Sequence, residues 1–588
     1  MKASKSVVCA VGICLLAFMR PVMSAASPAG DPAGRAQQQV THSFDRTVPL
    51  PSGQSLRIEH RFGDITVRTH ASRDVHVSAA IHVSASSQQD AETYANQIQI
   101  HIEPSASGVL VRTDYPEHAD SWWGGRNISM SVEYVVELPA DAPLTVRNKF
   151  GKVNVAGLKA ATDIDAEQGS VSVHDGKGTQ LVRASFGSVE LITNDGDADL
   201  GSTNGSVTAS DIKGSLTIHD RFGTVSATNI DRSATITNSN GSVRLHRAGA
   251  STISNSFGGV DAGDITGDLV LRNQNGSVDV TNVSGAADIS TSFAKITFLN
   301  IKQRMICKSQ NGSITGSAVG GAATIHTSFG TVDVHDVGGA LEVVDQNAKI
   351  IARDIRGPAN LRTTFASIEA SGIHGDATIA SSNAAIHLSD IQGSIDVRTS
   401  MGSVSAVDVR GGAHVVTGNA SVSLSGVKEE AYVKTSFGVV KADDIGGRIT
   451  VESSNGSVKA QNVHGPANVR TSFGSVRLDE IYGSVDVEDQ NGTVEVSTSS
   501  AKNASGSCNA ITLRTSMSPL RVYLDESSKY DVFAHTSLGR VTSELPLTTT
   551  GMISGDSLNA KINGGGCQLQ LTNNNGNIEI LKNNSARH

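Results

Sequence analysis

The chain has 588 residues, a formal net charge of −9 at pH 7, 59 glycines and only 4% aromatic residues. A single compact core stops growing at roughly 250–300 residues, so one globular domain is excluded, and either several domains or a one-dimensional repeat array remains. The negative charge spread over this length argues against a general nucleic-acid-binding protein, and abundant Gly, Ser, Thr, Val and Asn favour strands joined by tight turns.

Residues 1–26 read as a secretory signal peptide. Lys2 and Lys5 precede an apolar run from Val7 to Met19, and small residues follow it as a cleavage site. The run is short for a spanning helix, although an uncleaved anchor is the alternative. No later stretch reaches about 18 consecutive apolar residues. We therefore expect an exported protein, periplasmic or at the cell surface or secreted, with no stable membrane span after signal removal.

The next two segments are expected to be a leader and a cap. Residues 27–41 are rich in Ala, Pro, Gly and Gln, which predicts a flexible leader. Residues 42–145 predict an N-terminal β-rich cap segment with one short helix from Ser87 to Ile98. Ser87 is its expected N-cap, and one face carries Ala91, Tyr94, Ala95 and Ile98.

Residues 146–496 repeat with a period of 18. Stepping back by 18 from the turn glycine Gly492 marks one turn after another to Gly258, and after a single 17-residue step to Gly241 the period resumes down to Gly151. This gives twenty coils. With the turn glycine as position 0, positions 2, 4, 7, 11 and 13 are mostly apolar, and Cys307 occupies position 13.

This spacing predicts an elongated, all-β fold, a β-solenoid (single-stranded β-helix) with about 18 residues per coil. One coil cannot bury its own apolar face, so coils must stack, and twenty coils at about 4.8 Å each give about 95 Å. A complete turn of 36 residues is the alternative, because position 17 alternates between Phe and Asn, as at Phe473 and Asn491. We expect the Phe side chains to pack into the core and Asn to take a left-handed turn conformation.

Aspartates recur at position 6 of the coils. Their expected role is to cap turns by accepting backbone hydrogen bonds, and a ladder of calcium sites is the alternative. The positions are Asp211, Asp264, Asp336, Asp354, Asp390 and Asp408.

Residues 497–588 predict a C-terminal β-rich cap, whose final segment around Leu569 to Leu581 forms a last irregular coil. Cys508 and Cys567 both lie in this region, and in an oxidising compartment they are candidates for a disulfide that staples it. No CxxC motif or matching His spacing accompanies the cysteines, so we expect no metal site and no cofactor.

The repeated elements resemble the bacterial putative adhesin family, whose β-strand-repeat domain has no known function. The resemblance is carried by Ser-Phe-Gly-Ser-Val at Ser185 to Val189, Ser-Asn-Gly-Ser-Val at Ser454 to Val458, and the closing Asn575-Gly576-Asn577-Ile578. It covers nearly all of the chain after the signal peptide. It implies an extracytoplasmic β-solenoid and, through the name alone, adhesion, and it supplies no catalytic or binding residues.

One surface column suggests a binding track. Four basic residues at position 14 fall 36 residues apart, on every second coil: Arg362, Arg398, Lys434 and Arg470. They are candidates for contacting an anionic envelope polymer, but the favoured alternative is an ion ladder with Glu452 and Glu488 on the intervening coils.

The sequence shows no nucleophile motif, phosphate loop or HExxH. We therefore expect a non-catalytic adhesin or cell-envelope scaffold whose partner is an envelope polysaccharide or a surface protein, with self-association left open. A polysaccharide-binding module is the alternative. An enzyme acting on polysaccharide is a further alternative, although the position-3 carboxylates such as Glu190, Asp261 and Glu369 are dispersed over many coils.

Overall fold

The structure is a computed structural model that describes residues 38–116, 128–498, 509–549 and 554–583. The chain divides into two compact units. Of the described residues, the smaller unit comprises residues 38–42, 81–98, 115–116 and 128–131, and the larger comprises residues 43–80, 99–114, 132–498, 509–549 and 554–583. The predicted signal peptide and most of the predicted leader lie outside the described residues, although strand β1 (Gln38–Pro49) already begins within residues 27–41.

The smaller unit contains the predicted helix. Helix α1 spans Gln88–Gln97, and the Ser87 hydroxyl caps it by accepting a hydrogen bond from the backbone N–H of Asp90 at 3.1 Å. Ala91 and Ala95 of the helix and Ile98, its C-cap, are buried, so the predicted apolar face is confirmed at these three positions.

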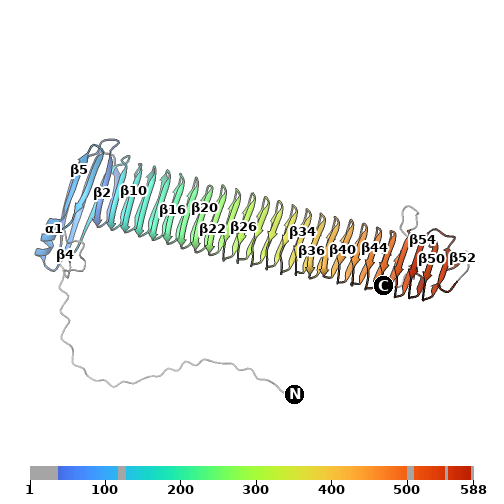
Figure 1. Cartoon of the computed structure of the whole chain (residues 1–588). Coiled ribbons are helices and arrows are strands. Elements are labelled where there is room, and N and C mark those ends of the chain that lie inside the picture. Colours follow the sequence, from blue (N-terminus) through green and yellow to red (C-terminus); the bar gives the residue numbers. More distant parts are fainter. Residues whose placement is uncertain (1–37, 117–127, 499–508, 550–553, 584–588) are drawn as a thin grey trace, which may run out of the picture. The chain divides into compact units, whose positions relative to one another are not determined.

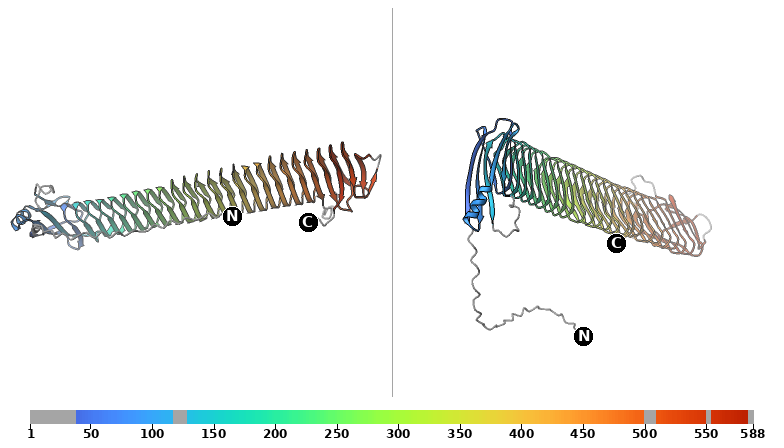
Figure 2. Two further views of the ribbon diagram at one scale, coloured as in Figure 1. Left: turned by 90° about the horizontal axis from the view of Figure 1, so that it is seen from below. Right: turned by 60° about the vertical axis from the view of Figure 1, so that its left-hand side comes forward.

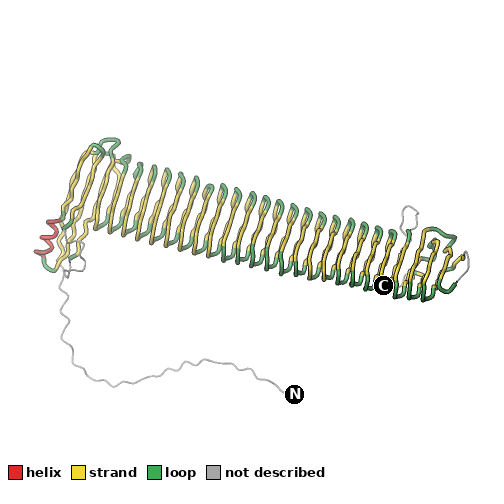
Figure 3. Tube along the Cα trace, in the orientation of Figure 1, coloured by secondary structure: helices red, strands yellow, loops and turns green. Residues whose placement is uncertain are grey.

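The larger unit is the predicted β-solenoid (Figure 1). Its twenty regular coils run from β8 (Leu144–Phe150) and β9 (Val153–Ala156) to β46 (Val485–Asp489) and β47 (Val494–Thr498). Each strand pairs in parallel with the strand one coil on, as in Thr162↔Gln180, so a full turn takes 18 residues rather than 36. Within the twenty regular coils, the even-numbered strands belong to one sheet and the odd-numbered strands to the other, and Figures 2 and 3 show the regular succession of coils and connecting turns.

The residues that fill the interior of the coils are those that the repeat predicts. In one coil Val458, Ala460, Val463, Ala467 and Val469 fill positions 2, 4, 7, 11 and 13, and all are at most 1% exposed. Cys307 is a buried free cysteine between Ile289 and Ile325 of the neighbouring coils, which confirms it as a core residue.

Position 6 is where the chain adopts the left-handed conformation. Asp211 has φ 58° and Asp264 φ 56°, and Asp336, Asp354, Asp390 and Asp408 lie between 52° and 57°. Asp and Asn tolerate this region better than other non-glycine residues, which explains their recurrence. The side chains also link coils, since the Asn282 amide donates to the Asp264 carboxylate at 2.8 Å. The prediction that Asn adopts this conformation at position 17 is wrong, because the left-handed turn lies at position 6.

Both ends of the stack are built out of chain order. At the first end, β2 (Ser55–Phe62) and β3 (Ile65–His70) pair with β8 and β9, while β6 (Gly108–Asp114) and β7 (Ser129–Pro139) add a further coil. Strand β5 (Gln99–Ser105) then pairs antiparallel with β6. An antiparallel strand of this kind covers an edge that would otherwise expose unpaired backbone groups.

The other end follows the same design. After β48 (Ile511–Thr515) and β49 (Leu520–Leu524), the next coil in space is β54 (Cys567–Asn573) and β55 (Ile578–Lys582). The predicted last coil is therefore a coil, but β50 (Tyr530–Thr536) lies beyond it. Strand β53 (Ser557–Ile562) pairs antiparallel with β50 and covers this edge.

Candidate interaction surface

The phenylalanines at position 17 face solvent. Phe293 and Phe365 are each 60% exposed and Phe473 is 59% exposed. The prediction that these side chains fill the core is therefore wrong. The physical reason is that positions 2, 4, 7, 11 and 13 already fill the interior. Position 17 is either the last residue of its strand, as at Phe186, or lies in the turn just after it, as at Phe473, so strand alternation no longer dictates its side-chain direction.

We call this row the phenylalanine edge. On alternate coils it presents an exposed large apolar side chain, and each of these is between 48% and 75% exposed. In spatial order the apolar members are Phe186, Phe222, Phe257, Phe293, Phe329, Phe365, Met401, Phe437, Phe473, Met517 and Leu538. Every coil between two of them presents an asparagine at the same place: Asn204, Asn240, Asn275, Asn311, Asn347, Asn383, Asn419, Asn455, Asn491 and Asn575.

The alternation follows space rather than chain order. In the strand register Arg514 of β48 lies beside Glu488 of β46, which places Met517 on the coil after Asn491. Thr515 and Thr536 both pair with Asn573, which places Asn575 between Met517 and Leu538. Although the chain reaches Leu538 before Asn575, the stack still alternates apolar residue and asparagine.

The edge begins differently at its other end. Phe62 and Phe150 lie on adjacent coils and their rings stack with centroids 5.3 Å apart. Gln168 then separates Phe150 from Phe186. The alternation of apolar residue and asparagine therefore starts at Phe186, which pairs with Asn204 of the next coil.

A polar groove of about 490 Å³ runs beside the edge over five coils. Its lining includes Arg272, Lys308 and His326 at position 14 and Ser292 and Gln310 at position 16. The residues that follow position 16 are those of the phenylalanine edge, so hydrogen-bonding groups lie next to aromatic rings. Among the described residues Lys308 and His326 have no hydrogen-bonded or ionic partner, whereas Arg272 binds the Asp288 carboxylate at 2.6 Å. Sequence reasoning did not identify this groove.

The predicted basic track is largely neutralised. Arg398 lies 2.7 Å from Asp396, Lys434 lies 3.0 Å from Glu452, and Arg470 lies 3.8 Å from Glu488. Hydrogen bonding to Glu452 raises the pKa of Lys434. Only Arg362, at the end of β32 (Ala359–Arg362), has no such partner within the part of the chain that the structure describes. For Lys434 and Arg470 the geometry is that of the ion ladder along the stack.

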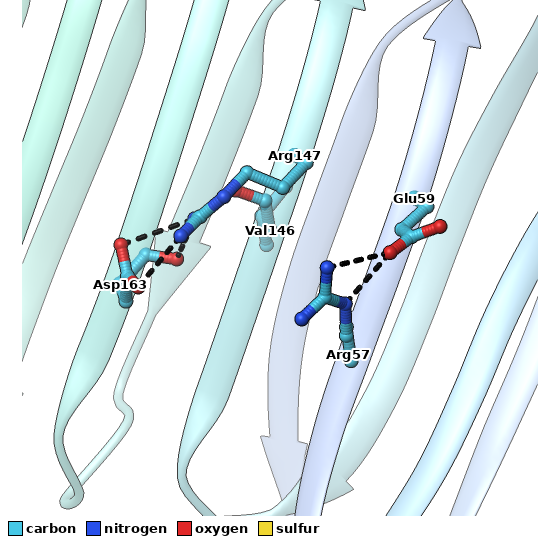
Figure 4. A network of polar contacts seen from close by, with 5 residues as sticks. All are labelled: Arg57, Glu59, Val146, Arg147 and Asp163. Carbon is cyan, nitrogen blue, oxygen red and sulfur yellow. Dashed lines mark hydrogen bonds and ion pairs between the residues drawn. The ribbon is translucent and has the colours of Figure 1, made fainter.

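Ion pairs between neighbouring coils recur on the same sheet. Figure 4 shows Arg147, whose guanidinium donates to both carboxylate oxygens of Asp163 at 3.0 and 2.7 Å and also to the Val146 carbonyl. Arg57 and Glu59, one coil away, pair within a single strand at 2.7 Å. Arg183 likewise reaches the neighbouring coil, where it donates to one carboxylate oxygen of Asp199 at 2.7 Å. The pairs of Arg147 and Arg183 hold adjacent coils in register, whereas that of Arg57 lies within one strand.

A row of buried polar side chains at position 15 underlies the groove. The Asn273 amide donates to the carbonyls of Gly258 and Gly276 at 3.1 and 2.8 Å, and Asn238 and Asn255 bridge successive turns in the same way. Asp220 stands in this row, and burial raises its pKa to about 6. Strand alternation from positions 11 and 13 is the signal that places position 15 inside.

No group of three His, Cys, Asp or Glu residues that could hold a metal ion occurs among residues 38–116, 128–498, 509–549 and 554–583. The dispersed carboxylates of position 3 are engaged separately, as where Glu369 binds Lys349 at 2.7 Å and Asp333 binds Arg353 at 3.0 Å. Cys567 begins β54, while Cys508 lies outside the described residues, so their disulfide stays a prediction. None of the helices in the described part of the chain is both long and apolar enough to cross a membrane.

Comparison with known proteins adds little. No family model matches the chain, and no curated protein matches it. The crystal structure of a putative cell adhesion protein from Clostridium sporogenes is 9% identical and covers 40% of this chain and 100% of its own, with a TM-score of 0.19. That score is too low to carry an argument, so the adhesin family remains a resemblance.

Proposed function

We propose that this protein is a non-catalytic, extracytoplasmic adhesin or cell-envelope scaffold whose contact surface is the phenylalanine edge. The observation that carries the proposal is the exposure of eleven large apolar side chains in one row. The core is filled without them, so their presence on the surface calls for a role outside folding. Soluble monomers rarely expose long apolar patches, and aromatic residues and Met are enriched where proteins bind one another.

The experiment compares attachment of the purified chain to cell envelopes from the producing organism. Phe293, Phe329 and Phe365 are changed to Asn, the residue that the intervening coils carry at the same place. The control changes Leu299 and Val407 to Asn, because these side chains are 48% and 41% exposed but lie away from the edge. We expect at least a tenfold loss of binding for the edge variant only. Equal binding by both variants, or release of sugar fragments from the envelope, would contradict the proposal.

The groove favours a second candidate, a polysaccharide-binding module. Lys308 and His326 offer cationic and hydrogen-bonding groups, and the neighbouring rings of Phe293 and Phe329 offer stacking surfaces for sugars. The test titrates the chain with polygalacturonate. Lys308→Ser with His326→Ser is expected to weaken binding, whereas changing Arg362, Arg398, Lys434 and Arg470 to Ser is expected to leave it unchanged. The reverse pattern would identify the basic track as the binding surface and would exclude the groove.

A further inference from the structure

The phenylalanine edge has the size of a protein interface. Its apolar side chains are about half exposed or more, and large side chains contribute about 150–250 Å² each, so the row carries on the order of 1,000 Å² of accessible surface. A standard interface buries about 800 Å² per partner. Most of the edge would therefore have to be covered along its whole length for a partner to bind stably.

The period of the edge restricts what can cover it. The apolar side chains recur on every second coil, about 9.6 Å apart, over a row about 95 Å long. A partner with a different repeat falls out of register after a few steps. A second copy of this chain has the same repeat and can match every step.

The profile of the edge is complementary to itself. Between Phe293 and Phe329 the intervening coil presents Asn311, and the same step from large to small recurs between Phe329 and Phe365, where Asn347 lies. Two edges displaced by one coil, about 4.8 Å, place each Phe of one copy opposite an Asn of the other. Interdigitation of this kind is the packing that close-packed interfaces require.

The charges beside the edge do not oppose pairing. The net charge of the chain is −9, yet no Asp or Glu stands immediately before or after the edge residues from Asn204 to Leu538. Position 16 is Ser, Thr, Gln, Asn or Gly there, except for Arg221, and the residues two places after the edge include only Lys295, Lys349 and Arg540 as charged side chains. Two identical edges can therefore approach without a row of like charges meeting.

From these observations we infer that two copies of this chain pair side by side through the phenylalanine edge, with each Phe of one copy in the gap over an Asn of the other. This inference rests on the proposed function, because it names the first partner of the same surface. With the two copies antiparallel, a two-fold axis perpendicular to the stack and midway between a Phe coil and an Asn coil sets each Phe opposite an Asn, and the dimer is isologous.

Sedimentation of the purified chain tests the pairing. We expect a concentration-dependent dimer between about 1 and 100 μM, and an association at least about 100-fold weaker when Phe257, Phe293, Phe329, Phe365 and Phe437 are changed to Asn. The control variant with Leu299→Asn and Val407→Asn is expected to dimerise like the unchanged chain. Circular dichroism shows whether each variant retains its strands.

The opposite substitution separates interdigitation from general stickiness. Asn311→Phe with Asn347→Phe adds apolar surface but fills the gaps, so interdigitating edges must associate more weakly, whereas nonspecific adhesion would strengthen. A monomeric unchanged chain, or stronger association of the gap-filled variant, overturns the inference. Envelope binding is measured separately. If the chain binds envelopes but never dimerises, only the inferred pairing is contradicted. If it dimerises but binds no envelope, only the proposed function is contradicted.

Discussion

The side-chain amide of Asn575 donates to the sulfur of Met517 at 3.3 Å, although 58 residues of chain separate them. They are consecutive members of the phenylalanine edge, one from the coil of β54 and one from the coil of β48. The alternation along the edge thus continues in the last coils, where the 18-residue repeat of the sequence has ended. It follows the order of the coils in space and not the order of residues in the chain.

Replacing Asp220 by Asn should stabilise the protein at neutral pH. The neighbouring Asn238 donates to glycine carbonyls in the same buried row, and an ionised carboxylate cannot donate. Burial raises the pKa of Asp220 to about 6 from an ordinary value of 3.8. The folded state therefore binds this proton more tightly than the unfolded state does. The stability that protonated Asp220 contributes is fully present below about pH 4 and is lost as the pH rises to about 6.

The measurement is chemical denaturation of both proteins between pH 4 and pH 7. The advantage of Asp220→Asn should grow across this range to on the order of 1–3 kcal/mol at pH 7. Asp261→Asn, on an exposed ion-paired side chain, serves as the control. A pH-independent difference for Asp220→Asn would show that this carboxyl is not perturbed by burial.

Glycine should improve the left-handed position 6 where an ordinary residue occupies it. Ala318 has φ 59°, whereas Gly372 and Gly426 occupy the same position with φ 65° and 71°. We expect Ala318→Gly to raise the free energy of unfolding by about 0.5–1 kcal/mol and Gly372→Ala to lower it by about 1 kcal/mol. Urea unfolding measures both, and a loss of stability in Ala318→Gly would refute the strain argument.

Arg521 should hold the last coils together. Its guanidinium donates to Glu495 and to Glu579, each at 2.8 Å, and these three residues lie on three successive coils. Arg521→Gln leaves two carboxylates flanking a neutral side chain, so we expect local opening to become easier by about 1–2 kcal/mol. Hydrogen exchange should quicken in β49 and β55 but stay unchanged in β11 (Val171–Lys177), which lies far along the stack.

Arg477→Gln is the matched control for Arg521. Arg477 pairs with Asp479 within its own strand at 2.7 Å and reaches Glu495 of the next coil only through longer-range electrostatic attraction, so its loss breaks no ion pair between coils among the described residues. Equal exchange in both variants would mean that the three-coil arrangement adds nothing beyond an ordinary surface pair.

Most of the fold could be predicted from the sequence because strand alternation and the 18-residue period act on every coil. Val458 and Val469 are buried as their positions require, and the partners of Lys434 and Arg470 lie one coil away as the ladder alternative places them. Phe473 could not be placed, because hydrophobicity favours burial while the turn at its position directs the side chain outward. The strict exchange of Phe for Asn, a residue seldom left in an apolar core, was the signal that position 17 faces water.

The order of the last coils was also beyond prediction. The offsets of 26, 58 and 37 residues that relate Glu488 to Arg514, Thr515 to Asn573 and Asn573 to Thr536 share no period. No local feature of the sequence of β50 or β54 indicates which of the two strands lies farther from the regular coils. In the observed order the outer strand β50 is the one that pairs with the antiparallel β53, which covers backbone groups that would otherwise be unpaired at this end.

The oxidation rate of Met401 by hydrogen peroxide, followed by mass spectrometry over a range of protein concentrations, tests the central claim most directly. Met401 is 48% exposed on the phenylalanine edge, whereas Met305 is 1% exposed in the core. The account predicts that Met401 oxidises readily in dilute protein and becomes protected as the concentration rises, while Met305 resists throughout. A Met401 that resists oxidation like Met305 at every concentration would contradict an outward-facing edge, and one that oxidises equally at every concentration would contradict its pairing.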